Sequence, residues 1–321
     1  MLKFIAKRIL VSIPILLAVT IITFFLIHAA PGDPADILMN PRTKPEERER
    51  IRKNLGLDKP VIVQYGIWLK NLVTKGDMGY SLVTGRPVKK VIMEKIPATL
   101  LLMGSSYILS LALSIPLGVW SAVRKNTFFD YLLTFFSFFG LSVPSFWLAL
   151  MAIFLFTQKL GWFPSLGMIS VETGNWWTKT VNIMWHLFLP MMVLTIRNLA
   201  SWTRYLRSSM IETLQEDYIR TARAFGIPED DITFKYALKP ASLPMLTLIG
   251  LSLPQVAAGS FVIEFLFGWP GIGRLGIEAI MKRDFSVIMG DILIASVLII
   301  LGNLLADLLY GWFDPRIRVK D

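Results

Sequence analysis

The apolar positions of this chain gather into six long runs, and the segments between them hold most of its charged residues. The runs cover residues 9–29, 99–123, 131–156, 185–205, 243–267 and 286–312. A helix that crosses the hydrocarbon core of a bilayer needs about 20 predominantly apolar residues, and each run is of that order. The pattern therefore predicts an all-α, polytopic membrane protein with six transmembrane helices.

Ionisable residues inside such runs are candidates for function, because a charge at membrane depth is costly unless it pairs or faces a cavity. Four residues qualify: Arg197, Glu264, Asp291 and Asp307. For Arg197 two interpretations are open, a structural ion pair with Asp307, which we favour, and contact with a substrate. His28 and His186 each stand alone, without carboxylates at ligand spacing, so we expect no metal site and no catalytic residue.

Composition agrees with lipid as the solvent. Of 321 residues 54% are hydrophobic and only 17% are charged, which is too apolar for an ordinary soluble domain. The first apolar run of about 20 residues exceeds the usual signal-peptide core of about 7 to 15, so residues 1–30 are predicted to be a retained N-terminus and first span. Cysteine is absent, which excludes disulfides and thiolate metal sites.

The distribution of basic residues predicts the orientation. Lys and Arg are enriched in short cytoplasmic loops, whereas loops beyond about 60 residues translocate largely regardless of charge. With both termini and residues 204–239 in the cytoplasm, every cytoplasmic piece is basic, and residues 31–97 form an external segment. The net charge of +10 is spread over these loops without a basic, aromatic-bearing stripe, so we expect no nucleic-acid partner.

The external segments are predicted to be structured. Thr43 and Glu46 form a capping box ahead of a helix that ends at Gly56, and a second helix extends over residues 60–73. Four tryptophans in the later external loop are typical of anchoring at the membrane interface: Trp162, Trp176, Trp177 and Trp185.

The stretch "YIRTARAFGIPEDDITFKYALKP", residues 218–240, is charged and lies between two apolar runs. Residues 209–225 are predicted to form a helix that stops at Gly226, followed by a second short helix that begins at Pro228 and ends at Pro240. Tyr218, Ala222 and Phe225 share one predicted apolar face. The pattern fits docking into a groove on a soluble partner and equally fits a helix lying in the headgroup layer.

This stretch resembles the "EAA" loop of ABC-importer permeases, in the variant form of the peptide and nickel branch, where "DYIRTARA" is typical. Arg220, Thr221, Tyr236 and Lys239 depart from the generic pattern of that loop. Three further motifs resemble the same branch: "APGDP" at residues 30–34, "EFLFGWPGIGRL" at residues 264–275 and "DPRI" at residues 314–317. The overall likeness is to oligopeptide permease subunits of the B type.

The resemblance implies a type I ABC-importer permease fold, with residues 98–321 as its core and residues 208–240 as its coupling loop. It implies a second homologous permease, two ATPase subunits and an external solute-binding protein as partners in a prokaryotic cytoplasmic membrane. ATP and Mg would be bound by the ATPases, since no Gly-Lys-Ser or Gly-Lys-Thr follows a glycine loop here and no cofactor or enzymatic activity is expected in this chain.

Two sets of residues carry these implied roles. The ATPase-coupling residues are Tyr218, Arg220, Thr221, Ala222, Arg223, Phe225, Gly226 and Leu238. The residues that either close an external gate, meet the binding protein, or simply make a tight turn are Gly268, Trp269, Pro270, Gly271 and Gly273.

Other function classes fit the sequence less well. An ion-coupled secondary transporter would be expected to show repeated halves and matched broken spans, and a membrane hydrolase would need a nucleophile with its base or a metal motif. Neither pattern is present in the sequence. The cargo implied by the resemblance is an oligopeptide, with dipeptides, nickel and oligosaccharides as alternatives.

Overall fold

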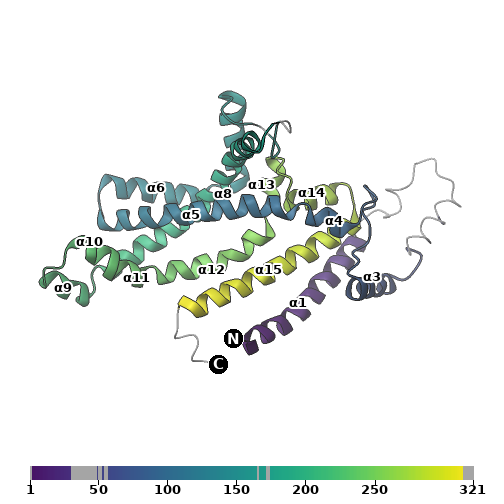
Figure 1. Ribbon diagram of the computed structural model, residues 1–321, viewed down its shortest axis with the longest axis horizontal. Coiled ribbons are helices and arrows are strands. Elements are labelled where there is room, and N and C mark those ends of the chain that lie inside the picture. The colour runs from purple at the N-terminus through teal and green to yellow at the C-terminus, as the bar shows by residue number, and fades with distance from the viewer. Residues whose placement is uncertain are drawn as a thin grey trace.

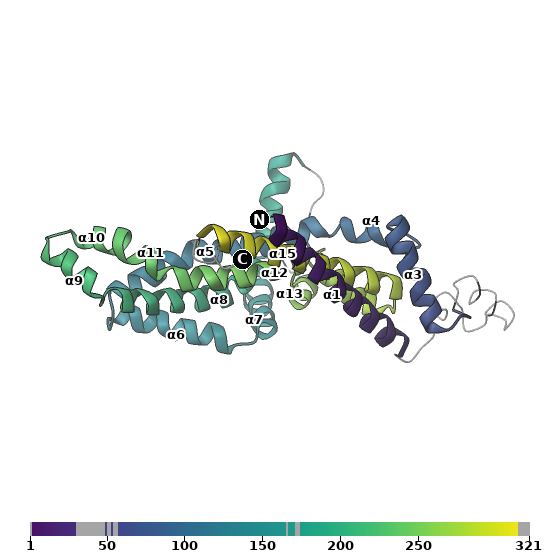
Figure 2. The same ribbon diagram turned by 90° about the horizontal axis from the view of Figure 1, so that it is seen from below.

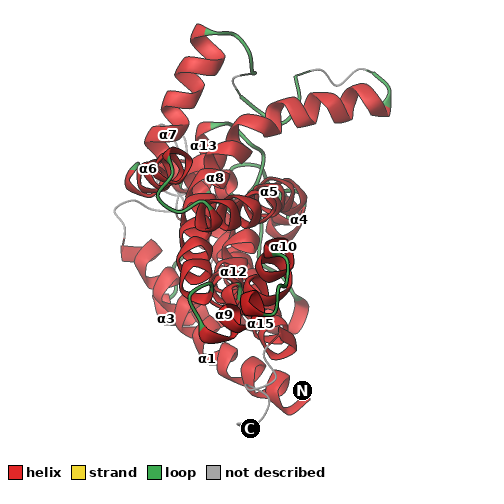
Figure 3. Ribbon diagram, turned by 90° about the vertical axis from the view of Figure 1, so that its left-hand side faces the viewer, coloured by secondary structure: helices red, strands yellow, loops and turns green. Residues whose placement is uncertain are grey.

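A computed structural model of the chain describes residues 2–29, 49, 53, 57–164, 166–170 and 174–313. These residues form helices and connecting loops, and they contain no strand beyond an isolated bridge between Tyr80 and Pro87 (Figures 1 and 3). The predicted capping box at Thr43, the helix end at Gly56 and the motifs at 30–34 and 314–317 lie outside the described residues.

The helices follow one another along the chain without domain-like interruptions. The first half holds α1 (Leu2–Ala29), α3 (Val61–Lys75), α4 (Val88–Met93), α5 (Ile96–Val123), α6 (Phe128–Ser142), α7 (Ser145–Ala152) and a π-helical turn, η2 (Ile153–Lys159). The second half holds α8 (Trp176–Thr213), α9 (Asp217–Ala224), α10 (Glu229–Asp231), the π-helical η3 (Ile232–Ala237), α11 (Leu238–Ala241), α12 (Leu243–Ala258), α13 (Phe261–Leu266), α14 (Ile272–Met281) and α15 (Phe285–Phe313).

Four helices in the described part of the chain are long and apolar enough to cross a membrane, or six spans result if each of two bent pairs counts as one. The long ones are α1, the continuous stretch from α4 to α5, α8 and α15. They contain the predicted first, second, fourth and sixth spans. The first bent pair contains the predicted third span, and the second joins residues 229–241 to residues 243–256 of the predicted fifth span. The all-α polytopic architecture is confirmed, while these two spans differ in shape from the others.

The predicted third span, residues 131–156, is two helices that meet at an angle of 105°. Pro144 lacks a backbone N–H, and its ring disfavours helical geometry in the residue before it. Val143 accordingly adopts an extended conformation, with φ −81° and ψ 127°, and α7 starts afresh at Ser145. The predicted third span is therefore present as a bent pair of helices.

The predicted fifth span, residues 243–267, also ends early. Helix α12 stops at Ala258, because Gly259 takes φ +80° and ψ −179°, which side-chain-bearing residues rarely adopt. The chain then forms the separate short helix α13. At its other end α12 continues from α11 through a bend of 48° at Ser242.

Small residues let the long helices approach closely. On α5, a Cβ at Gly118 would lie 3.0 Å from a side-chain carbon of Leu206 on α8. On α15, a Cβ at Gly302 would lie 2.7 Å from the Cα of Pro254 on α12. Such contacts are typical of helix packing in lipid, where no hydrophobic force separates helix–helix from helix–lipid contact.

The molecule is elongated, with two different ends. Helices α9 and α10 form one end of its long axis, and α3 and α4 lie at the other (Figures 1 and 2). At the α3 end, the buried carboxylate of Asp284 accepts hydrogen bonds from Ser81 Oγ at 2.5 Å and from the backbone N–H of Leu82 at 3.1 Å. This group fastens the chain ahead of α4 to the start of α15. The predicted helix at 60–73 is confirmed as α3.

We expect Gly302→Ala to destabilise the protein, because the added methyl group would clash with the backbone of Pro254, which cannot rotate away. Overpacking of this kind costs about 1 to 3 kcal/mol. Gly104→Ala in α5 is the matched control, since a Cβ there meets nothing within 4 Å. Thermal denaturation of the purified protein in detergent should show a lower midpoint for Gly302→Ala alone, and equal midpoints would contradict the packing described.

Candidate functional site

The segment between α8 and α12 folds as two short helices joined at a glycine, and we call residues 214–241 the handle. Helix α9 ends in a turn in which the N–H of Gly226 donates to the carbonyl of Arg223 and the N–H of Ile227 donates to the carbonyl of Ala222. Gly226 has φ +73°, as this helix ending requires. The predicted hinge is therefore confirmed in its conformation.

The two helices beside the hinge differ from the prediction in extent. The predicted helix over 209–225 is interrupted, since α8 ends at Thr213 and Glu216 is extended, with φ −66° and ψ 149°. The predicted stop at Pro240 is also wrong, because helical conformation continues to Ala241. The π-helical η3 precedes Pro240 and shifts the backbone hydrogen-bond pattern of the helix. The helix can therefore accommodate Pro240, which has no backbone N–H.

The apolar face of α9 is not the one predicted. Ile219 and Ala222 are buried, at 0% and 7% exposure, and belong to one core cluster with Met210 of α8 and Ile232 of η3. Phe225, in contrast, is 82% exposed and Tyr218 is also exposed. The grouping of Tyr218, Ala222 and Phe225 on one apolar face is therefore wrong: the buried face is formed by Ile219 and Ala222, and Phe225 follows the last residue of α9.

Charged side chains surround the hinge on its solvent side. Arg223 Nε donates to Glu229 Oε1 at 2.8 Å across the turn, Arg220 pairs with Asp217 within α9 at 3.2 Å, and the exposed Thr221 hydroxyl donates to the carbonyl of Asp217 at 2.9 Å. Exposed pairs of this kind contribute little stability. They do set the outer surface of the handle. Leu238 of α11 is partly buried and packs on the inner side, against the core cluster that holds Ile219 and Ala222.

Partial burial raises the pKa of the Tyr218 hydroxyl, and the neighbouring charge of Glu216 raises it further. The exposed surface of α9 therefore offers a neutral phenol, an apolar ring at Phe225 and two arginines. Such a surface can bind a groove that has both apolar and acidic walls.

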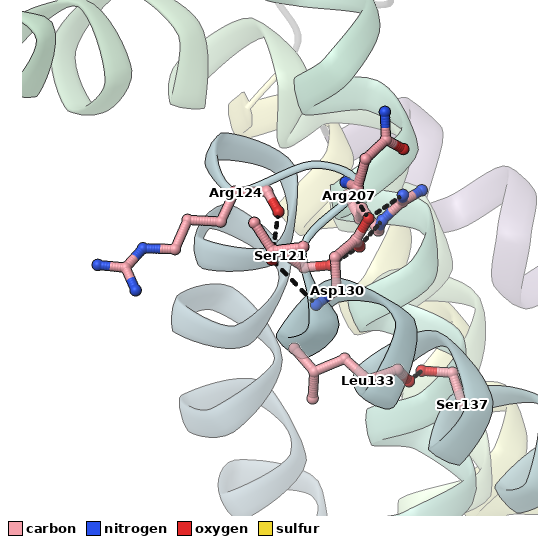
Figure 4. A network of polar contacts seen from close by, with 8 residues as sticks. Ser121, Arg124, Asp130, Leu133, Ser137 and Arg207 are labelled. Carbon is pink, nitrogen blue, oxygen red and sulfur yellow. Dashed lines mark hydrogen bonds and ion pairs between the residues drawn. The ribbon is translucent and has the colours of Figure 1, made fainter.

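A buried ion pair connects the turn between α5 and α6 to α8, six residues before α8 ends (Figure 4). Asp130, at 1% exposure, accepts from Arg207 Nε at 2.6 Å and from Arg207 Nη2 at 2.8 Å. Its carboxylate also accepts from Ser121 Oγ at 2.5 Å and from the backbone N–H of Asn126 at 3.0 Å. Every lone-pair direction of the carboxylate is thus used, which a buried charge requires.

The sequence analysis did not predict this ion pair, although the position of Asp130 gave a signal for one of its two members. Thr127 caps α6 by accepting from the N–H of Asp130, and a lone carboxylate in the first turn of an apolar helix is a cue for a local hydrogen-bonding role. Nothing local identifies Arg207 as the partner, since it lies on another helix. The pair fixes the base from which the handle extends.

Away from the handle, the side chain of Glu264 on α13 is surrounded by hydrogen-bond donors, and we call this group the cage. Glu264 is fully buried and accepts from Thr99 Oγ1 at 2.9 Å and from the backbone N–H of Gly273 at 2.8 Å. Thr99 in turn accepts from the N–H of Ile272 at 2.9 Å. A Cβ at Gly271 would lie 2.2 Å from Glu264 Oε2, so only glycine fits there. The cage joins α5, α13 and α14.

The predicted external motif lies around this cage. Trp269 is fully buried and donates from Nε1 to the carbonyl of Ala98 at 2.7 Å, while Gly268 has φ +61° and half-buried Pro270 follows. A Cβ at Gly273 would lie 2.8 Å from the backbone of Phe261. The geometry is that of a tight turn anchored to α5. Burial leaves the Trp269 ring no surface to offer to a binding protein.

The remaining intramembrane residues are dispersed, and the predicted pair of Arg197 with Asp307 is wrong. Asp307 of α15 pairs with Arg8 of α1 at 3.1 Å, which brings the first and last helices together. Arg197 instead lies at a cavity between helices. Asp291 is 2% exposed beside Gly276, where a Cβ would lie 2.5 Å from its Oδ2. The described residues contain no group of three metal-ligating side chains.

Comparison with known proteins gives matches along almost the whole chain. The family described as "Binding-protein-dependent transport system inner membrane component" matches residues 114–319, and the N-terminal family of such membrane components matches residues 1–103. An oligopeptide transport system permease protein, AppB of Bacillus subtilis, is 46% identical over 319 residues, 99% of this chain and 100% of the relative.

Two further relatives are similar over the same extent. The dipeptide transport system permease protein DppB of Alkalihalophilus pseudofirmus is 39% identical over 333 residues, with 99% of this chain and 100% of the relative covered. A putative peptide permease protein of Brucella suis biovar 1 is 40% identical over 322 residues, with the same coverage.

We expect Asp130→Asn to destabilise the protein by about 2 kcal/mol, because the change leaves Arg207 without its charged partner in a largely buried position. Glu229→Gln is the matched control, since it removes the carboxylate of the exposed Arg223 pair and should cost less than about 1 kcal/mol. Thermal denaturation of both variants in detergent, measured as the midpoint temperature, compares how much each ion pair contributes to stability. Similar midpoints for both variants would show that the Asp130 pair is no stronger than a surface pair.

Proposed function

This chain belongs to the family of binding-protein-dependent transport system inner membrane components, and from that premise we propose that it is the permease subunit of an ATP-driven ABC importer of peptides. The observation that carries the proposal is the full-length similarity to permeases named for oligopeptide and dipeptide transport. A chain with four to six apolar spans forms half of a translocation pathway, and the other half comes from a second homologous permease.

In such an importer, separate subunits deliver the peptide and hydrolyse ATP, and these subunits are the partners of this chain. An external binding protein delivers the peptide, and two ATPase subunits bind ATP and Mg on the cytoplasmic side of the cell membrane. This chain takes part in no phosphate chemistry, because its sequence lacks a glycine loop followed by Gly-Lys-Ser or Gly-Lys-Thr. Both termini and the handle lie in the cytoplasm, an assignment supported by the basic residues of those segments.

The handle transmits the motion of the ATPases to the spans. Its outer surface, with Tyr218, Arg220, Thr221 and Phe225, is free to dock, while Ile219 and Ala222 fasten α9 to the core cluster that includes α8. A force applied to α9 therefore reaches α8 directly through packed side chains, and reaches α12 through α10, η3 and α11. Such transmission needs a rigid element with two arrangements, and both the docked ATPase and the spans must be able to favour one arrangement over the other.

The cargo is a peptide, and oligopeptides are favoured because the relative named for oligopeptide transport is more similar than the one named for dipeptides. The external motif of Gly268, Trp269, Pro270, Gly271 and Gly273 then shapes the outer end of the pathway by holding α13 and α14 against α5. A role of this motif as a gate stays a prediction.

Reconstitution of the complex in lipid vesicles tests the function. This chain, the second permease, the two ATPases and the binding protein are expected to hydrolyse ATP faster when an oligopeptide is present and to accumulate that peptide inside the vesicles. Stimulation by dipeptides, nickel or oligosaccharides but not by oligopeptides would reassign the cargo. Absence of any ATP-dependent uptake would contradict the importer itself.

We expect Gly226→Val to leave the complex assembled but to reduce peptide uptake per ATP hydrolysed by about tenfold, since a β-branched residue resists positive φ at a cost of ~1 to 2 kcal/mol. A Cβ at this position meets nothing within 4 Å, so the change acts on the backbone alone. Gly226→Asn is the control, because asparagine tolerates positive φ and should retain most of the coupling. Normal uptake by Gly226→Val would refute the role of the hinge.

A further inference from the structure

A cavity of about 220 Å³ opens between the helices, and polar groups interrupt its largely apolar walls. It is bounded by α5, α7, α8, α12 and the link between α12 and α13. Its walls carry hydroxyl and amide groups from several helices: Ser106, Ser145, Asn198, Ser252, Gln255 and Ser260. Hydroxyls and amides in such number are unexpected on a surface that only packs against lipid or against another apolar helix.

Arg197 of α8 is the one charged side chain among the described residues that line this cavity. It is exposed and makes no ion pair or hydrogen bond within the described part of the chain. The carboxylates at membrane depth lie elsewhere: Asp307 pairs with Arg8, Glu264 lies in its cage of donors, and Asp291 is buried beside Gly276 and does not line this cavity. The cavity therefore presents a cation and holds no anion of its own.

An unpaired cation inside a membrane protein is costly and usually faces a cavity through which something passes. Its planar guanidinium group carries five donors in a fork that matches a carboxylate in two parallel hydrogen bonds. The hydroxyls of Ser106 and Ser252 already donate to carbonyls of their own helices. The amides of Asn198 and Gln255 can both donate to and accept from a peptide backbone, and so can the hydroxyls of Ser145 and Ser260. Together these groups match the end of a peptide chain, where a carboxylate follows an amide.

We propose that Arg197 is a substrate-binding residue of the translocation pathway that receives the C-terminal carboxylate of the transported peptide. The proposal rests on the function proposed above and adds a residue and a chemical group to it. A terminal carboxylate is common to peptides of every sequence, so one arginine can serve cargo whose side chains vary. The surrounding hydroxyls and amides hydrogen-bond the last peptide units without regard to side chain.

Uptake of one oligopeptide in two forms tests the assignment, as the free acid and as the C-terminal amide. The peptide carries no acidic side chain, and uptake by the reconstituted complex is normalised to the amount of peptide-loaded binding protein. We expect Arg197→Gln to lower uptake of the free acid by about tenfold, the loss typical of one hydrogen-bonded charge, and to change uptake of the amide less than about twofold. Arg197→Lys retains the charge but not the two-pronged donor geometry, so it should restore the free-acid rate only in part.

Arg204→Gln is the matched control, because Arg204 lies on the same helix, is exposed and does not line this cavity. It should leave the ratio of the two uptake rates as in the wild type. An equal loss for both peptide forms in Arg197→Gln would overturn the assignment and indicate that Arg197 pairs with a carboxylate of the second permease. Unchanged uptake of both forms would overturn it as well. If the wild-type complex takes up neither form, the importer function itself fails.

Discussion

A charge inside a low-dielectric body must find a partner, and this constraint organises the helices of the protein. Asp130 and Arg207 connect the α5–α6 turn to α8, and Arg8 with Asp307 connects the first helix to the last. Glu264 is surrounded by donors from Thr99 and from the start of α14. Breaking the buried pair of Asp130 with Arg207 leaves an uncompensated charge, so this pair holds its helices in a particular register. The more exposed pair of Arg8 with Asp307 contributes less.

The same constraint explains how the handle can act. Its own ion pairs are exposed and weak, whereas the base beneath it is held by the buried pair of Asp130 with Arg207 and by the core cluster around Met210. The outer surface can therefore adapt to a partner while the connection to α8 stays stiff. A stiff base with an adaptable surface is what the transmission of a docking motion demands.

Local sequence pattern predicted those features that depend on local physics. Apolar runs located the spans, and glycine's tolerance of positive φ located the hinge at Gly226. The predicted pair of Arg197 with Asp307 is wrong. Ion pairs between helices depend on how each helix is rotated about its axis and on how deep each residue lies in the membrane, and the spacing of residues along the chain specifies neither. The predicted apolar face of α9 is wrong for a related reason: the residues that face inwards are those that meet the core cluster of α8 and η3, and this contact lies between segments.

The helices of the predicted third and fifth spans are interrupted beside the same cavity. Ser145 follows the bend at Pro144, and Gly259 and Ser260 follow the end of α12, and all three line the space next to Arg197. Non-helical backbone at membrane depth is tolerated only where protein covers it or where it lines a water-filled space. In natural proteins, departures from the structure that the local sequence favours are concentrated at functional sites. The breaks thus support, independently of the charge of Arg197, a polar pathway at this place in the bundle.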